Sequence, residues 1–351
     1  MSIETKGIGK YMGLEYVEPI KTVFLNIWVT CNCNYRCEYC YEGHDKSNFH
    51  MDILLADQTV QFIIDMINKK GLDCIKINFH GGEPTLNFMI VEYIVERIRK
   101  YSSIKIATSM TTNCSTYISN AVDTLDEISV SIDGKKETHD RKRKRKDGQG
   151  TFDVSFSNAL LYLKAYPDVN LNMVVTADNA IELYDNIMFF VRNGFRNITP
   201  SIDYFDANWN YDLFEVLYLQ LKKVKEEICF QGLKDVKISI FDQLISTKKR
   251  CIVGMDQFQI MPDGCLYPCA IVAGLPDYCF GNVKFGIDKQ KVEQLNKLMD
   301  SKVYECSDCS YYDCCMTCRC YFFNEKLTGS MYSPSGVVCA VEHLRMKLKR
   351  V

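Results

Sequence analysis

Two periodic patterns of apolar residues alternate along the first 230 residues of this 351-residue chain. Short apolar runs with the length of a strand are separated by stretches in which apolar residues recur every three or four positions, as on one face of a helix. The segment from Val60 to Ile67 has the clearest helical repeat, and Gly71 follows where a helix C-cap is expected. Strands that alternate with helices predict a parallel sheet with helical crossovers.

These patterns predict six strand–helix units. The predicted strands are Thr22–Val29, Cys74–His80, Ile104–Met110, Glu127–Ile132, Asn170–Val175 and Asn197–Tyr204. The predicted helices are Ala56–Lys70, Phe88–Tyr101, Ser155–Ala165, Ile181–Asn193 and Leu213–Cys229. Six units are too few for a complete eight-stranded barrel, so we expect an α/β fold with an open sheet.

The pattern changes at about residue 236, where helical periodicity fades and cysteines, glycines and turn sequences take its place. Six of the 18 cysteines lie between residues 306 and 320. A segment this rich in cysteine is expected to be organised by metal more than by a hydrophobic core. With a soft prior of about 150 residues per domain, we predict an N-terminal extension (1–21), a barrel domain (22–235) and a cysteine-rich C-terminal domain (236–351).

Charge and composition narrow the setting in which the chain works. The formal net charge of -2 gives no overall attraction to nucleic acid or to a membrane surface. No N-terminal run has the form of a signal peptide, and no uninterrupted apolar segment reaches the roughly 18 residues of a membrane span. We therefore expect a cytoplasmic protein, in which many cysteines indicate metal rather than disulfides.

Three cysteines with short spacing follow the first predicted strand. Cys33, Cys37 and Cys40 form the pattern Cys-x3-Cys-x2-Cys, so one short loop holds three thiolates around one point. A cubane iron–sulfur cluster normally takes four cysteine ligands, and three leave one iron open for a substrate or cofactor. A zinc knuckle or a structural cluster is the alternative, and Cys31 could serve as a fourth ligand.

Further polar and glycine-rich motifs follow the next three predicted strands. Gly81-Gly82-Glu83-Pro84 follows the second strand, Thr111-Thr112-Asn113 the third, and Ser131-Ile132-Asp133-Gly134 ends the fourth. Active sites of parallel α/β folds lie at the carboxyl ends of the strands. We therefore expect these motifs and the cysteine loop to share one site, with glycines at 81 and 82 because side chains there would block a cofactor.

The cysteine spacing, with the aromatic Tyr39 before the last cysteine, resembles the signature of the radical SAM enzymes, and the glycine motif resembles their GGEP motif. The resemblance implies a partial (β/α)6 TIM-like barrel and a catalytic 4Fe-4S cluster on Cys33, Cys37 and Cys40, whose open iron holds S-adenosylmethionine. Gly81, Gly82 and Glu83 would receive the methionyl amino group. The implied cofactor-binding residues are Tyr39, Gly81, Gly82, Glu83, Pro84, Thr112, Asn113, Ser131, Asp133 and Arg143.

The stretch from Ser131 to Arg143, which includes His139 and Asp140, resembles the SxDG…HDxxR segment of sulfatase-maturase-like enzymes. The resemblance implies that Ser131 and Arg143 hold the ribose or the carboxylate of the cofactor. Arginine suits a carboxylate because its planar fork can bond both oxygens. Residues 141–146 are all basic. Such a run is normally a solvated loop, although it could also attract an acidic peptide.

The C-terminal cysteines resemble a SPASM domain, which carries two auxiliary iron–sulfur clusters, so the resemblance implies three 4Fe-4S clusters in all. Cys251, Gly264 and Cys269 match the start of the family pattern, Cys306 and Cys309 its middle, and Cys339 its end. The intervening register is ambiguous. The metal ligands to be assigned there are Cys314, Cys315, Cys318 and Cys320.

The first auxiliary cluster has only three evident ligands: Cys251, Cys269, and Cys318 or Cys320. Either Cys265 or Cys279 completes the set, or one iron stays open, as it is thought to in thioether-forming peptide maturases. A zinc ribbon is the alternative. A zinc ribbon uses only four cysteines, however, and this region contains more than four.

One residue departs from the sulfatase-maturase pattern. That family reads Tyr-Pro-Cys-Asp, with the aspartate as proposed general base, where this chain has Ala270 after Cys269. We therefore expect a peptide or protein substrate that receives a thioether or carbon–carbon crosslink. The alternatives are formylglycine formation, dehydrogenation of a sugar or aminocyclitol, or a non-enzymatic electron-transfer module.

The expected partners follow from this interpretation. An electron donor such as flavodoxin or ferredoxin would reduce the clusters. The roughly 20 residues before the first strand are too few for a leader-binding domain, so a separate binding protein is expected to supply one. Neither nucleic acid nor membrane is expected as a partner.

Overall fold

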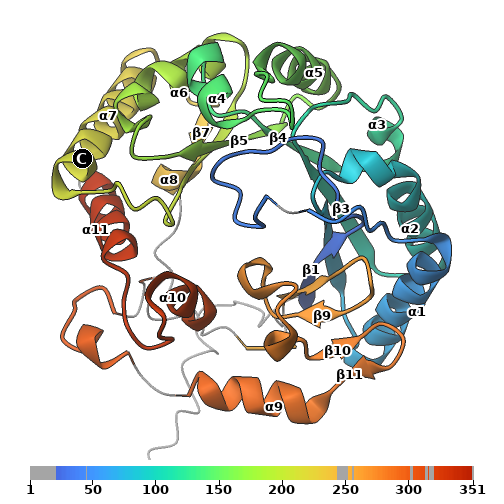
Figure 1. Ribbon diagram of the computed structural model, residues 1–351. Coiled ribbons are helices and arrows are strands. Elements are labelled where there is room, and N and C mark those ends of the chain that lie inside the picture. The colour runs from blue at the N-terminus through green and yellow to red at the C-terminus, as the bar shows by residue number, and fades with distance from the viewer. Residues whose placement is uncertain are drawn as a thin grey trace, which may run out of the picture.

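The computed structural model describes residues 21–44, 46–242, 252–254, 257–300, 303–312, 315 and 320–349. Six parallel strands run side by side in chain order, and helices cover their outer face to form an open barrel (Figure 1). The strands are β1 (Thr22–Trp28), β2 (Cys74–His80), β3 (Lys105–Thr112), β4 (Glu127–Ser131), β5 (Asn170–Val175) and β6 (Asn197–Ile202). The α/β fold with parallel strands and helical crossovers is therefore confirmed.

The helices between these strands lie close to the predicted positions, with two additions. They are α1 (Ile53–Lys70), α2 (Phe88–Tyr101), α3 (Ala121–Thr124), α4 (Lys136–Lys142), α5 (Phe152–Ala165), α6 (Leu183–Arg192) and α7 (Tyr211–Phe230). Asp52 caps the start of α1 by accepting the Leu55 N–H, and Gly71 ends it at φ 58°. The short helices α3 and α4 escaped the periodicity analysis because neither has two full turns of apolar repeat.

The sheet extends at both edges with strands from beyond residue 235. β7 (Lys237–Ile238) pairs with β6, and β8 (Gln257–Ile260) pairs in parallel with β1 before β9 (Leu266–Tyr267) turns back beside it. Within the described residues the order is β7-β6-β5-β4-β3-β2-β1-β8-β9. The C-terminal region therefore begins as part of the barrel sheet, directly beside the strand that carries the cysteine loop.

The rest of the C-terminal region lies along the open side of the barrel (Figure 1). Its elements are α8 (Ser239–Asp242), β10 (Gly281–Asn282), β11 (Gly286–Ile287), α9 (Lys289–Leu298), α10 (Tyr321–Thr328) and α11 (Gly336–Lys349), with short 3₁₀ helices at Ala270–Val272, Pro276–Tyr278 and Tyr304–Cys306. α11 packs against α7, as Figure 1 shows. No described helix has the length and apolar character needed to cross a membrane.

Candidate functional site

The cysteine loop is held by backbone hydrogen bonds on both sides. The N–H groups of Arg36 and Glu38 donate to the carbonyls of Lys144 and Lys142, at 2.7 and 2.9 Å. Tyr35 is buried, and its hydroxyl lies 2.9 Å from Ser155 Oγ. The backbone of the basic run therefore pairs with the cysteine loop, while the side chains of Arg145 and Lys146 remain exposed to solvent.

Gly81 and Gly82 lie against the start of the same loop. A Cβ atom on Gly81 would stand 2.3 Å from the Thr30 carbonyl oxygen, and one on Gly82 would stand 2.1 Å from that of Asn32. Gly81 also has a φ of +140°, which L side chains rarely adopt. The glycines are thus required by the approach of the cysteine loop itself, a constraint that our cofactor-based expectation did not include.

Glu83 is 1% exposed, and its carboxylate joins the ends of β2 and β3. One oxygen accepts hydrogen bonds from the Thr85 N–H, the Thr85 hydroxyl and the Thr112 hydroxyl, and the other accepts the Asn113 N–H at 2.7 Å. Burial raises the pKa of this carboxyl, and the four hydrogen bonds oppose that rise. Glu83 therefore positions the Thr112–Asn113 turn and retains room for one further donor on Oε2.

Arg143 is buried beneath the cysteine loop. Its Nε lies 3.0 Å from Asp133 Oδ1, its guanidinium centre lies 5.4 Å from the ring centroid of Tyr39, and its Nη1 lies 4.0 Å from Cys37 Sγ. The Tyr39 hydroxyl donates to Asp133 Oδ2, and the Val174 N–H donates to Asp133 Oδ1. Burial alone would lower the pKa of Arg143, but Asp133 raises it well above its ordinary value. The arginine is thus a fixed cation beside the thiols.

His139 holds the turn that brings Arg143 into this place. Its Nδ1 accepts the Asp133 N–H, so its Nε2–H donates to Thr151 Oγ1, 2.9 Å away. Thr151 Oγ1 in turn donates to the Arg143 carbonyl. Burial lowers the pKa of His139 to about 4, so the ring is neutral at pH 7. Asp140 accepts the N–H groups of Thr151 and Phe152 at the start of α5.

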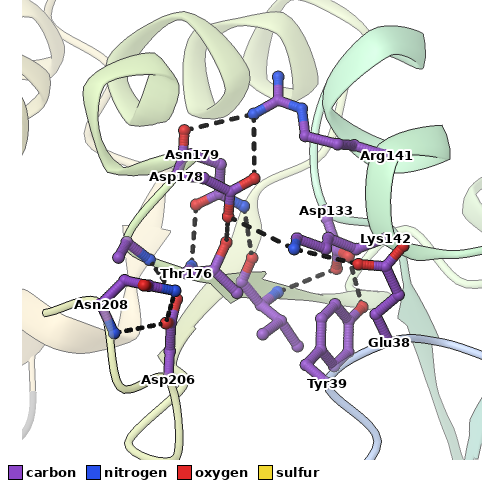
Figure 2. Close-up of polar contacts among 12 residues, drawn as sticks. Glu38, Tyr39, Asp133, Arg141, Lys142, Thr176, Asp178, Asn179, Asp206 and Asn208 are labelled. Carbon is purple, nitrogen blue, oxygen red and sulfur yellow. Dashed lines mark hydrogen bonds and ion pairs between the residues drawn. The ribbon is translucent and has the colours of Figure 1, made fainter.

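Figure 2 shows the outer side of this region, where Arg141 and Lys142 lie beside carboxylates. Lys142 lies 3.1 Å from Glu38 and 4.0 Å from Asp178, while Arg141 binds Asp178 and Glu182. Of the consecutive basic residues, Arg143 alone lines the cavity described next, among the residues that the structure describes. The assignment of Arg143 to the cofactor stays a prediction.

A cavity of about 360 Å³ opens at the carboxyl ends of the strands. Nine further predicted site residues line it with Cys33, Cys37 and Cys40: Tyr39, Gly81, Gly82, Glu83, Thr112, Asn113, Ser131 and Arg143 from the cofactor set, and Thr111 from the third motif. Pro84 and Asp133 lie outside the lining. Asp133 supports Tyr39 and Arg143, whereas Pro84 begins the 3₁₀ helix Pro84–Asn87.

The thiols of the loop differ in their surroundings. Cys33 is buried and accepts a hydrogen bond of 3.7 Å from Asn113 Nδ2. Burial raises the pKa of the Cys37 thiol to about 12, against the lowering effect of Arg143. Cys31 packs instead against Trp28, Met261 and Tyr267, outside the cavity lining. The three cysteines of the motif therefore line one cavity, and the fourth does not.

Several lining residues were missed by sequence reasoning. Glu42 and Lys46 form an ion pair of 2.6 Å at the cavity edge, and His80 lies 3.9 Å from Glu42. Further ones come from the cysteine loop and β5 (Tyr35, Arg36, Tyr41, Gly43, His44 and Val174), and from the end of β6 and the C-terminal region (Ser201, Ile202, Asp203, Tyr204, Phe205, Ile271 and Phe323). For the residues after β6, the predicted end of the sixth strand was the feature of the sequence that could have indicated the site. No feature of the sequence indicated Ile271 or Phe323.

A second, more polar chamber of about 470 Å³ adjoins the first. The two share six lining residues: Tyr39, Cys40, Tyr41, Asp203, Phe205 and Ile271. We call the first the inner chamber, the second the outer chamber, and the six shared residues the neck. The outer chamber therefore adjoins the inner chamber beside Cys40 of the cysteine loop.

The structure describes only part of the predicted auxiliary sites. Cys251, Cys314 and Cys318 lie outside the described residues. Burial raises the pKa of the Cys339 thiol, and the thiols of Cys315 and Cys309 raise it further. Cys339 therefore lies close to both. Cys306 and Cys269 are partly buried against the main core, and Cys320 is partly buried at the start of α10. Cys265 and Cys279 pack with Cys31 against Trp28, Met261 and Tyr267.

Comparison with known proteins places this geometry in context. Residues 22–153 match the model of a 4Fe-4S single cluster domain. The cysteine-type anaerobic sulfatase-maturating enzyme of Clostridium perfringens strain ATCC 13124 is 26% identical over 313 residues, which span 81% of this chain and 84% of that protein. The radical SAM cyclopropyl synthase TigE of Paramaledivibacter caminithermalis is 23% identical over 303 residues, 77% of this chain and 61% of that protein. The chain is homologous to the radical SAM enzymes.

Solved structures show that this radical SAM homologue shares their fold. Native anSMEcpe with bound AdoMet and Kp18Cys peptide superposes with a TM-score of 0.78 at 23% identity, over 93% of this chain and 96% of that one. Streptococcus suis SuiB bound to precursor peptide SuiA superposes with a TM-score of 0.61 at 18% identity, over 91% and 76%. The expected radical SAM fold is therefore confirmed.

Proposed function

We propose that the protein is a radical SAM enzyme that crosslinks a peptide substrate. The observation that carries this proposal is the inner chamber, in which three thiols meet the Gly81–Gly82 turn and the buried Arg143. Cys33, Cys37 and Cys40 would hold a 4Fe-4S cluster that leaves one iron for S-adenosylmethionine. Bound together, these cofactors supply a 5′-deoxyadenosyl radical, while the protein supplies orientation and excludes water.

The residues around the thiols fit the polar parts of S-adenosylmethionine. Asn113, Ser131 and Arg143 line the same cavity, and Arg143 offers a fixed positive charge to a carboxylate. Glu83 has capacity on Oε2 for one donor, which suits an ammonium group. We assign the cofactor to this wall of the inner chamber for these reasons.

Two further 4Fe-4S clusters would occupy the C-terminal region, which makes three in all. The proximity of Cys339 to Cys315 and Cys309 supports one set of four thiols that also includes Cys306, whose carbonyl accepts the Cys309 N–H. Cys315 fits the third thiol of this set, and Cys314 lies outside the described residues. Cys269 would belong to the other cluster.

A peptide substrate would enter through the outer chamber. Ala270 packs against Trp28, Met261 and Tyr267, and its neighbour Ile271 lines the neck. Sulfatase maturases carry a carboxylate at this position as the proposed general base. Alanine has no group that could accept a proton in its place. This departure favours a crosslink over formylglycine.

Formylglycine formation is the second candidate, because the similarity to the sulfatase-maturating enzyme of Clostridium perfringens extends over 81% of the chain. Mass spectrometry separates the two. We would incubate the reduced protein and S-adenosylmethionine with two synthetic peptides, a sulfatase-type cysteine peptide and a cysteine-rich peptide without the sulfatase motif. A crosslink appears as the loss of two hydrogens without an aldehyde. Efficient conversion of cysteine to an aldehyde would overturn the crosslinking proposal.

A further inference from the structure

The neck between the two chambers contains a single carboxylate among the described residues, that of Asp203. Asp203 follows β6 directly and is partly buried. Its neighbours in the neck are mainly aromatic or apolar, including Phe205 and Ile271. Asp203 therefore borders both chambers.

The other carboxylates that line the chambers are already engaged by side-chain donors. Glu38 binds Lys142 and Lys144 with its two oxygens, and Asp206 accepts the Ala177 N–H with one oxygen and Asn208 with the other. Figure 2 shows the contact of Glu38 with Lys142 and that of Asp206 with Asn208. In the inner chamber, both oxygens of Glu83 accept hydrogen bonds, and those of Glu42 face Lys46 and His80.

Asp203 differs from this group. Its Oδ1 accepts the Phe205 N–H at 3.0 Å, whereas no side chain in the described part of the chain donates a hydrogen bond to either oxygen. Its backbone is fixed, because its N–H donates to the Val175 carbonyl and its own carbonyl accepts the Trp209 Nε1–H. Burial raises the pKa of the Asp203 carboxyl, against the backbone N–H of Phe205 and the charge of Lys142.

We propose that Asp203 is a catalytic residue that accepts the proton released by the substrate during crosslinking. This inference rests on the proposed peptide-crosslinking function. It places the proton acceptor at the end of β6, in the same neck as Ile271, which directly follows the Ala270 that replaces the expected aspartate.

With a substrate thiol, the peptide would first lose one hydrogen atom from a carbon to the 5′-deoxyadenosyl group that the bound cofactors supply. The S–H bond would then break, its proton would move to the Asp203 carboxylate, and a carbon–sulfur bond would form. The one electron left over would pass to an oxidised iron–sulfur cluster. The peptide loses two hydrogens in total.

The test compares Asp203→Asn with the wild-type holoenzyme on the cysteine peptide that the wild type crosslinks. A general base typically contributes 10²–10⁴-fold, so we expect the rate of crosslinking to fall about 100-fold. Formation of 5′-deoxyadenosine and the peptide Kd should each change by less than about threefold, because hydrogen abstraction and binding precede the proton transfer. Asp203→Glu should recover part of the crosslinking rate.

Asp206→Asn is the control for damage to the same loop, since both Asp206 oxygens hold backbone or side-chain N–H groups there. Crosslinking that falls equally in both variants would assign the effect to loop structure and overturn the proposal. A matching fall in peptide affinity for Asp203→Asn would assign Asp203 to binding and also overturn it. Absence of any crosslinking by the wild type would instead refute the proposed function on which this inference rests.

Discussion

Arg143 is held by groups on several sides that each favour its charge. Asp133 pairs with its Nε, the ring of Tyr39 faces its guanidinium, and Cys37 Sγ lies 4.0 Å from its Nη1. A cation over an aromatic ring gains roughly 0.5–2 kcal/mol, depending on how far it is desolvated. This fixed position suits a residue that recognises a carboxylate.

Arg143→Lys should weaken S-adenosylmethionine binding about tenfold, because a charge-assisted hydrogen bond contributes roughly 1.5–3 kcal/mol. Lysine retains the charge that Asp133 needs, so the variant should stay folded. Equilibrium binding measures the effect, with Arg141→Ala as a control, because Arg141 binds Asp178 and Glu182 outside the cavity. Normal binding by Arg143→Lys together with weak binding by Arg145→Ala would show that the assigned register is wrong.

Glu83→Gln should lower both stability and cofactor affinity. The amide nitrogen cannot accept the Asn113 N–H, so we expect a loss of about 2 kcal/mol in the free energy of unfolding. Urea unfolding and S-adenosylmethionine binding measure the two effects. Unchanged stability would contradict the role of Glu83 in joining β2 to β3.

The lowered pKa of the buried His139 ring predicts that the free energy of unfolding depends on pH. The folded protein keeps the ring neutral down to a pKa of about 4, below its ordinary value of 6.5. The stabilising contribution is therefore complete above pH 6.5 and is lost as the pH falls toward 4. Between pH 7 and pH 5, the free energy of unfolding should fall about 2 kcal/mol more in the wild type than in His139→Gln. Parallel pH profiles in urea unfolding would contradict this account.

At the scale of elements, periodicity located the strands β1 to β6 and the long helices, because each buries an apolar face that repeats in the sequence. The Gly71 cap was also predictable, since a left-handed residue closes α1 there. The pairing of residues 142–144 with the cysteine loop was not predictable from the sequence. It is a long-range backbone contact inside a run of charged residues. The charge of this run alone indicated a loop exposed to solvent.

The contact between the glycine turn and the cysteine loop predicts the result of Gly82→Ala. The added Cβ would meet the Asn32 carbonyl at 2.1 Å, so the loop must move. We expect a loss of about four iron atoms per chain, the content of one cubane cluster. Gly336→Ala is the control, because a Cβ at Gly336 meets nothing within 4 Å. Full iron content in Gly82→Ala would contradict the contact.

At the scale of the whole molecule, β8 joins the barrel sheet beside β1, and Ile271, a few residues after β9, reaches the neck. The sequence could not reveal this, because β8 and β9 have four and two residues and lie far from β1 in the chain. The motifs at the strand ends were predictable, since parallel strands place their carboxyl ends on one edge. Phe323 belongs to no motif, and only the fold brings it to the inner chamber, whereas for Asp203 the predicted end of the sixth strand was a signal.

The most direct test of the account replaces Cys33, Cys37 and Cys40 together with alanine. With three clusters, the wild type should bind about 12 iron atoms per chain and the triple variant about eight. The variant should form no 5′-deoxyadenosine from S-adenosylmethionine under reducing conditions, whereas Cys229→Ala, at an exposed thiol, should match the wild type. Undiminished 5′-deoxyadenosine formation by the triple variant would contradict the central claim.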